Sequence, residues 1–264
     1  MRKVALLIIL GLIPAITIAQ GSVNKRLNVV ILGDSNTSIG GDDCNIPKGW
    51  TKWFCEKFNP ASCHSYARSG ATWSHTVSTI YDVEENTGKL SDHNVIYNQI
   101  NRLKQAVKQG RQVIPDVILI AAGTNDAWFQ QRRPKAFTKT VEQVFDNQDA
   151  FITERTPQTV LSLAEVIRYD CELLMEAFPE AQIVLLTPIQ SVATNDIGKV
   201  SDIIAECGHM MSLSVIRQNF GSSIYRVREK VQHKYTSDGT HTTELGARRN
   251  GYFIANQLNA ILLY

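Results

Sequence analysis

The amino-acid sequence predicts an α/β fold: a three-layer sandwich in which helices cover both faces of a central, mostly parallel five-stranded sheet. Several runs of Val, Ile and Leu lack the alternation of polar and apolar residues, as is typical of strands buried on both faces. These runs alternate along the chain with segments whose apolar residues recur at the helical period. Alternating strands and helices indicate a parallel sheet wrapped by helices.

The elements follow in order along the chain. Buried apolar runs, or short segments between turn residues, indicate the strands, and apolar residues at helical spacing indicate the helices. Asn59-Pro60 and Pro179 provide helix stops, because proline cannot continue a helix. The expected strands are residues 27–32, 63–67, 116–121, 183–186 and 223–227. The expected helices are residues 50–58, 95–108, 157–178, 203–220 and 244–263.

Residues 1–19 have the features of a secretory signal peptide. Arg2 and Lys3 precede an almost wholly apolar run, and Ala19 supplies a small residue before a cleavage site. The run is shorter than the roughly 20 residues of a membrane-spanning helix, and Pro14 interrupts it. We therefore expect cleavage and a secreted or periplasmic protein without stable membrane insertion, with an uncleaved anchor as the alternative. Residues 20–264 would form a single domain.

The mature chain is expected to be nearly neutral. The formal net charge of the whole sequence is +2, and Arg2 and Lys3 account for it. The sequence has no basic stripe of the kind that predicts nucleic-acid binding. Its length and ordinary apolar content allow a core that needs no disulfide or metal to stabilise it. The oligomeric state stays open.

Five cysteines lie in the part of the chain expected to be exported. Export permits disulfides, and three cysteines cluster after the first predicted strand, so one bridge among these three is plausible, its pairing left open. The odd number leaves at least one thiol free. A zinc site is the disfavoured alternative, because the sequence contains no Cys-x-x-Cys and no His-x-x-x-His pair. We expect no metal and no other cofactor. The cysteines are Cys44, Cys55, Cys63, Cys171 and Cys207.

Two short motifs about two hundred residues apart supply the groups of a serine hydrolase. Gly33-Asp34-Ser35-Asn36 places a serine on a turn directly after the first predicted strand. Asp238-Gly239-Thr240-His241 places an aspartate three residues before a late histidine. A serine hydroxyl becomes a good nucleophile when an imidazole takes its proton, and a carboxylate can orient that imidazole. The candidate catalytic residues are Ser35, His241 and Asp238.

Two further motifs could donate hydrogen bonds to a developing oxyanion. Ser69-Gly70-Ala71-Thr72 and Gly123-Thr124-Asn125-Asp126 follow predicted strands, and ligands of parallel sheets bind at the carboxyl ends of strands. Glycine lets the backbone approach a substrate closely, and the asparagine amide donates without adding charge. We interpret Asp34 and Asp126 as structural residues that bond loop backbone.

In this order, the four motifs resemble the SGNH hydrolases, the GDSL-type esterases and lipases. The resemblance spans nearly the whole mature chain and implies a flavodoxin-like fold. It also implies a role for each matching residue: Ser35 as nucleophile, His241 as general base and Asp238 as its orienting acid. The implied oxyanion hole consists of the backbone N–H groups of Ser35 and Gly70 and the side-chain amide of Asn125. Asn36 departs from the Leu or Ile of many members, which gives the lipase branch less support.

Trp73 and Trp128 follow the two oxyanion motifs and are candidate substrate-binding residues, able to stack on a sugar ring or line an acyl pocket. The long connection at residues 127–156 is a candidate cap or rim. Together these features predict an exported serine esterase that removes short acyl groups, such as O-acetyl, from a glycan or another small acylated molecule. Three alternatives stay open: a lipase- or lysophospholipase-like enzyme, an acyltransferase, and a catalytically silent carbohydrate-binding relative.

Overall fold

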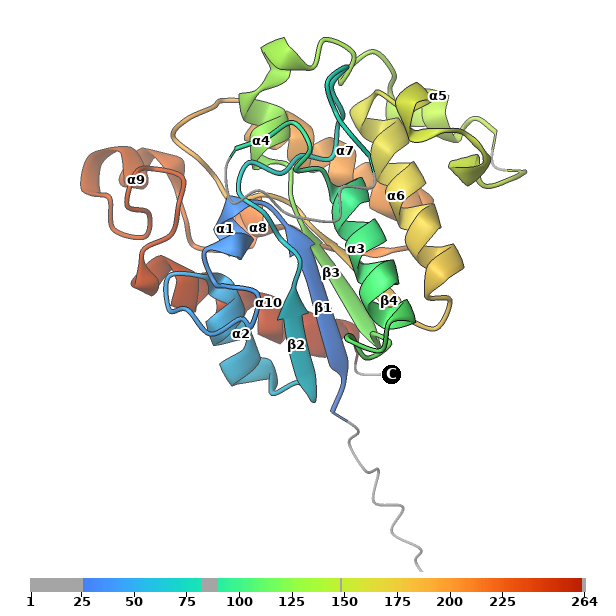
Figure 1. The fold of residues 1–264 in the computed structure, drawn as a ribbon. Coiled ribbons are helices and arrows are strands. Elements are labelled where there is room, and N and C mark those ends of the chain that lie inside the picture. Colours follow the sequence, from blue (N-terminus) through green and yellow to red (C-terminus); the bar gives the residue numbers. More distant parts are fainter. Residues whose placement is uncertain (1–25, 82–89, 148, 263–264) are drawn as a thin grey trace, which may run out of the picture.

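The computed structural model describes residues 26–81, 90–147 and 149–262. The predicted signal peptide lies outside these residues. Within them, five parallel strands form one sheet in the order β2-β1-β3-β4-β5 (Figure 1). The strands are β1 (Asn28–Gly33), β2 (Ser62–Ser65), β3 (Val117–Ala121), β4 (Gln182–Leu186) and β5 (Ser214–Ile216). The predicted α/β class is confirmed, and the sheet is parallel throughout.

Helices cover both faces of the sheet (Figure 1). Side chains alternate along a strand, so Val30 and Leu32 pack into one core and Val29 and Ile31 into the other. The first core includes α3, α6 and α7, and the second includes α2 and α10. The α-helices are α1 (Ser35–Ser38), α2 (Trp50–Phe58), α3 (Ile96–Lys108), α4 (Thr124–Trp128), α5 (Val141–Phe145), α6 (Leu163–Ala177), α7 (Ile197–Met210), α8 (Gln218–Gly221), α9 (Arg226–Gln232) and α10 (Glu244–Ile261). The 3-10 helices are η1 (Gln130–Arg132), η2 (Ile152–Glu154) and η3 (Pro157–Thr159).

The end of α7 and the last strand differ from the prediction. The helix expected at residues 203–220 ends at Met210, where Ser212 takes a left-handed conformation (φ 55°) and Leu213 N–H donates to Gly208 O at 2.8 Å. The chain then forms β5, whereas the strand predicted at residues 223–227 is a short loop up to Tyr225 followed by the first two residues of α9. Only one of the three residues of β5 is fully buried, so this strand has neither an apolar run nor an alternating pattern.

The start of α6 also differs from the prediction. Pro157 begins a separate 3-10 turn, and α6 starts only at Leu163. Ser162 caps α6: its hydroxyl accepts from the Glu165 N–H, and the Glu165 carboxylate accepts from the Ser162 N–H. This reciprocal capping box satisfies two N–H groups that would otherwise lack partners.

The long connection at residues 127–156 packs on α6 and α7. Val141 and Phe145 of α5 are buried in the same core as these two helices. Buried Arg168 of α6 donates to the carbonyl oxygens of Val144, Asn147 and Ala150. Most of the segment is therefore anchored to the α6 side of the sheet, and a role as cap or rim stays a prediction.

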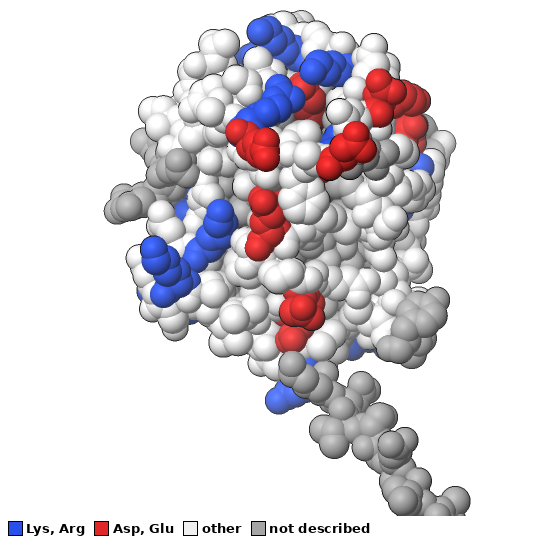
Figure 2. Space-filling model, turned by 90° about the vertical axis from the view of Figure 1, so that its right-hand side faces the viewer, with Lys and Arg blue, Asp and Glu red and all other residues white. Residues whose placement is uncertain are grey.

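Charge is mixed on the face of the molecule seen in Figure 2, where Lys and Arg side chains are interspersed with Asp and Glu. This mixture agrees with the nearly balanced count of 27 basic and 25 acidic residues. Among the described residues, no helix has both the length and the apolar character needed to cross a membrane.

Glu165 ties the long connection to α6 and makes a pH-dependent contribution to stability. Its carboxylate accepts from Lys139 Nζ at 2.6 Å and from an Arg155 guanidinium nitrogen at 2.8 Å. Burial raises the pKa of Glu165, but these two bonds and those from Ser162 outweigh it and lower the pKa from 4.5 to about 2. The folded state thus favours the ionised form. The contribution is complete above pH 4.5 and is lost as the pH falls toward 2.

We expect Glu165→Gln to lower the free energy of unfolding by about 1 kcal/mol at pH 7, because glutamine loses both ion pairs while keeping the size of the side chain. The difference from the wild type should shrink as the pH falls from 5 to 3. Urea unfolding at several pH values measures it, with Glu176→Gln, an exposed position on α6, as the control. A difference that does not change with pH would contradict this account.

Candidate active site

Ser35 lies directly past the carboxyl end of β1. The Asp34 carboxylate accepts from the Asn36 N–H at 3.0 Å and caps α1, so Ser35 is the first residue of that short helix. The Asp34 N–H donates to Ala121 O at 3.1 Å, which holds the turn against the end of β3. A Cβ atom on Gly33 would lie only 2.6 Å from the same carbonyl oxygen. Glycine is therefore required here for the two strands to come this close.

Gln99 holds the backbone just before Ser35. This residue of α3 is fully buried, and its amide accepts from the Gly33 N–H at 2.8 Å and donates to the Gly33 carbonyl at 2.9 Å. Sequence reasoning missed Gln99. A glutamine in an amphipathic helix resembles a surface residue, and nothing in the sequence pairs it with Gly33 across 66 positions.

The second catalytic motif meets Ser35 through a series of hydrogen bonds. His241 Nε2 lies 2.9 Å from Ser35 Oγ, and His241 Nδ1 lies 2.7 Å from Asp238 Oδ2. The other Asp238 oxygen accepts from the backbone N–H groups of Thr240 at 2.9 Å and His241 at 2.7 Å. The three residues predicted to be catalytic are thus brought together in the predicted order.

The loop that carries Asp238 and His241 is fixed on both sides. The Val192 N–H donates to Gly239 O at 2.8 Å, and the hydroxyls of Ser191 and Thr240 lie 2.6 Å apart. Before the loop, the fully buried Glu229 carboxylate accepts from the N–H groups of Tyr235 and Thr236, each at 2.8 Å.

The two carboxylates near Ser35 have opposite pKa shifts. Burial raises the pKa of Asp238, but hydrogen bonds from His241 and Thr240 outweigh it, so the net pKa lies below its ordinary value. Complete burial raises the pKa of Asp34 to about 6, although Thr124, Asn36 and His241 favour its ionised form. Asp238 therefore stays ionised well into the acid range. An ionised Asp238 holds a proton on Nδ1 of His241 and leaves the lone pair of Nε2 facing the serine.

Gly70 and Asn125 lie in two segments that are bonded together. Gly70 has a left-handed backbone (φ +73°), and Asn125 Nδ2 donates to Ala71 O at 2.9 Å. This bond uses one of the two N–H groups of the Asn125 amide, and the second N–H remains able to donate. Within the part of the chain that the structure describes, the backbone N–H groups of Ser35 and Gly70 have no hydrogen-bond acceptor. All three groups thus retain donor capacity.

Asp126 fixes the relative positions of these two segments. Its carboxylate accepts from Trp73 N–H at 3.0 Å, from Ser74 N–H at 2.9 Å and from Ser74 Oγ at 2.5 Å. Buried Arg133 also donates to Ser74 O and to Thr72 Oγ1, each at 3.2 Å. The structural interpretation of Asp34 and Asp126, as residues that bond loop backbone, is confirmed.

The prediction that Trp73 contacts substrate is wrong. Trp73 is fully buried in the core cluster that includes Val30 and Ile96, and its backbone N–H donates to the buried Asp126 carboxylate. Trp128, one helical turn after Asn125, is 45% exposed and stacks on Phe129 at 5.6 Å between ring centroids. A role for Trp128 in substrate binding stays a prediction.

Leu90 is an apolar neighbour of the site that sequence reasoning missed. A Cβ atom on Gly70 would lie 2.4 Å from Leu90 Cδ2, so the leucine side chain lies directly against this glycine. Leu90 is 70% exposed and offers an apolar surface beside the candidate oxyanion donor.

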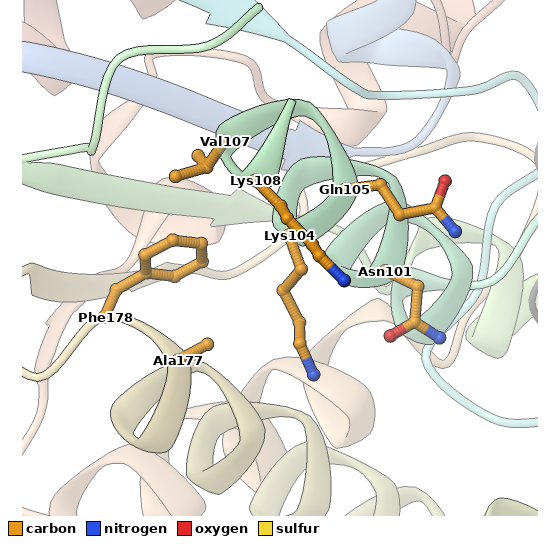
Figure 3. Close-up of a pocket in the computed structure, with 7 residues that line it drawn as sticks. All are labelled: Asn101, Lys104, Gln105, Val107, Lys108, Ala177 and Phe178. Carbon is orange, nitrogen blue, oxygen red and sulfur yellow. The ribbon is translucent and has the colours of Figure 1, made fainter. Parts of the chain in front are cut away.

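A large hollow lies away from these residues (Figure 3). It measures about 490 Å³ and lies between the carboxyl-terminal ends of α3 and α6. Those ends lead into the starts of β3 and β4, whereas Ser35 lies past the carboxyl end of β1. In contrast, the side chains of His241 and Asp238 are 33% and 54% exposed, so the candidate site opens directly at the surface. Seven residues line the hollow: Asn101, Lys104, Gln105, Val107, Lys108, Ala177 and Phe178.

Residues 29–251 match the sequence model of the GDSL-like lipase/acylhydrolase family, which therefore covers most of the chain, including all four motifs. The chain belongs to this family. Its members are esterases and lipases, so the protein is a carboxylic ester hydrolase. The resemblance expected from the four motifs is confirmed. A comparison with curated proteins gave no match.

Several solved structures share the fold at low sequence identity. A possible lipase from Chitinophaga pinensis is 13% identical, with 90% of this chain and 100% of that chain covered and a TM-score of 0.57. An acetyl xylan esterase is 15% identical, with 89% and 100% covered and a TM-score of 0.53. A carbohydrate acetylesterase from Sinorhizobium meliloti is 14% identical, with 90% and 100% covered and a TM-score of 0.53. These neighbours confirm the SGNH hydrolase fold.

We expect Gln99→Met to reduce kcat for p-nitrophenyl acetate with little change in KM. Methionine cannot bond the backbone of Gly33, so the turn that carries Ser35 would be held less firmly. The free energy of unfolding should fall by about 1–2 kcal/mol, since the buried Gly33 N–H loses its acceptor, while the Gly33 carbonyl keeps the bond from the Arg68 N–H. Gln99→Glu keeps the acceptor for the Gly33 N–H and should retain more activity. Kinetics and urea unfolding of both variants provide the measurement, and an unchanged kcat in Gln99→Met would refute a positioning role.

Proposed function

We propose that the protein is an exported serine esterase that hydrolyses short acyl esters, with O-acetyl groups on carbohydrate as the substrate class. The observation that carries the catalytic part is the continuous series of hydrogen bonds from Ser35 through His241 to Asp238. Export rests on residues 1–19 and stays a prediction from the sequence.

In the proposed reaction, Ser35 Oγ attacks the ester carbonyl carbon while its proton passes to His241 Nε2. The negative charge that develops on the carbonyl oxygen is stabilised by the N–H groups of Ser35 and Gly70 and by the Asn125 amide. The tetrahedral intermediate then expels the alcohol, which takes the proton from His241. Water, deprotonated by His241, attacks the acyl-serine, and the acid leaves as Ser35 regains its proton.

Asp238 would supply orientation and charge in both halves of the reaction. Its bond to Nδ1 keeps the imidazole ring in place and stabilises the imidazolium that forms when the serine proton is transferred. Its lowered pKa suits this role, because the carboxylate stays charged while His241 gains and loses protons.

Two observations favour a short acyl group on a sugar. The site opens at the surface, and the large hollow that could hold a long chain lies at the opposite end of the strands, by the starts of β3 and β4. Leu90 and Trp128 offer an apolar contact for a methyl group and an aromatic face for a sugar ring. Two neighbours with this fold are described as an acetyl xylan esterase and a carbohydrate acetylesterase.

We expect Ser35→Ala and His241→Ala each to abolish measurable hydrolysis of p-nitrophenyl acetate, because nucleophile and base act as a unit. Asp238→Asn should leave more activity, since the orienting carboxylate is the most forgiving of the three. Circular dichroism and thermal unfolding show whether each variant is folded. Wild-type turnover in folded Ser35→Ala would disprove the nucleophile assignment.

We expect Asn125→Ala to lower kcat by about 100- to 1,000-fold with little change in KM, as for a donor used mainly in the transition state. Asn125→Asp is the matched variant: it keeps the shape but cannot donate, so its kcat should fall at least as far. A change confined to KM would instead make Asn125 a residue of substrate binding.

We expect kcat/KM to fall steeply from acetyl to octanoyl p-nitrophenyl esters, because an open site has nowhere to bury extra methylene groups. A deep apolar pocket would instead gain about 0.8 kcal/mol per buried methylene. Release of acetate from acetylated xylan, pectin and peptidoglycan fragments tests the carbohydrate part, with Trp128→Ala as the variant. A maximum at octanoyl or longer chains would replace this proposal with a lipase-like activity.

A further inference from the structure

Three cysteine thiols from three successive segments converge in the core on the α2 face of the sheet. Cys44 lies in the loop after α1, Cys55 on α2 and Cys63 on β2. Their sulfur atoms all lie within 4.8 Å of one another, and those of Cys44 and Cys63 are 3.6 Å apart. All five cysteines of the chain are free thiols in the structure. The sequence-based expectation of one bridge among these three is therefore not met, because no two sulfurs are joined.

The spacing of the sulfurs suits ligands of one metal ion. With metal–sulfur bonds of about 2.3 Å, sulfurs around a tetrahedral or trigonal ion lie roughly 3.8–4.0 Å apart. A disulfide requires about 2.05 Å and joins only two of the three. The observed separations thus need only small shifts for binding a metal, whereas a bridge needs a much closer approach and leaves the third thiol beside it.

We propose that Cys44, Cys55 and Cys63 bind one thiophilic d10 metal ion, Zn²⁺ or Cu⁺. Thiolate ligands select such ions, and each thiol would release its proton on binding. Cys44 is buried, while Cys55 and Cys63 are half-buried, so one side of the cluster is accessible to solvent. Among the described residues no histidine or carboxylate joins the three sulfurs. Cu⁺ would take the three sulfurs alone, and Zn²⁺ would add a water molecule as its fourth ligand.

The ion would stabilise the loop between α1 and α2. Asp42, two residues before Cys44, accepts from Arg68 at 2.6 Å and 3.0 Å, and the Arg68 N–H donates to Gly33 O. Arg68 lies two residues before Gly70. The role of the ion would therefore be structural, and the Asp42–Arg68 ion pair connects this loop to the segment before Gly70. Its loss should lower thermal stability and leave the chemistry of Ser35 in place.

The test uses the reduced protein, purified without oxygen and titrated with Zn²⁺ or with Cu⁺ in competition with a chromophoric chelator. We expect one equivalent of ion per chain and a raised Tm for the ion that binds. Cys55→Ser and Cys63→Ser should each weaken binding by about 100-fold, because each removes one of only three protein ligands. Cys171→Ala and Cys207→Ala change buried cysteines outside the cluster and should bind as the wild type does.

Circular dichroism checks the fold of each variant without reference to catalysis, so the metal site and the esterase activity are tested separately. Three results would overturn the proposal. The first is the absence of stoichiometric binding of either ion by the folded wild type. The second is binding that survives serine at all three positions. The third is protein isolated without reductant that carries a mapped disulfide within the cluster and no metal.

Discussion

The close approach of β1 and β3 at their carboxyl ends is the constraint on which the candidate site depends. Gly33 pairs with Ala121, and the next N–H, that of Asp34, donates to the Ala121 carbonyl. In the strand order β2-β1-β3-β4-β5, the connections leave β1 and β3 toward opposite sides of the sheet, which opens a crevice between them. Ser35 follows the first of these strands and Asn125 follows the other. The same pairing therefore positions both the candidate nucleophile and a candidate oxyanion donor.

Around this crevice, carboxylates hold the loops by accepting backbone N–H groups. Asp34 caps the helix of Ser35, Asp126 fixes the segment after Gly70, and Glu229 fixes the chain before Asp238. Each is buried, and burial of a charge is tolerable only when hydrogen bonds satisfy it. Loops built in this way keep their geometry without an apolar core of their own. That property suits an open site whose catalytic groups come from distant parts of the chain.

The sequence predicted the parts of the structure that rest on local patterns. Ser35 and His241 were identifiable because each lies in a short motif in which the adjacent residues also have structural roles. The strands β1, β3 and β4 were identifiable because they are continuous apolar runs. β5 was misplaced because three residues with one buried position make no pattern. Trp73 was assigned to the site by its distance along the chain from Gly70, but its side chain is buried in the core, and its backbone is bonded to Asp126, more than fifty residues away. Gln99 depends on a contact with Gly33 across 66 positions, which spacing rules for short motifs do not detect. The clustering of Cys44, Cys55 and Cys63 was visible in the sequence, but the expected bridge was not formed.

The candidate catalytic residues and the exposed residues near them are held in different ways, and this difference affects which substrates the site could accept. The catalytic residues are held by bonds to the ends of the sheet, so their arrangement follows from the fold. Leu90, which lies against Gly70, and Trp128, three residues after Asn125, are exposed to solvent. Under the proposed function, a change at either position would alter what the site contacts without removing the hydrogen bonds that fix Ser35, His241 and Asn125. Under the proposed function, specificity would therefore depend on these exposed positions rather than on the bonds that fix Ser35, and neighbours with 13–15% identity retain the fold.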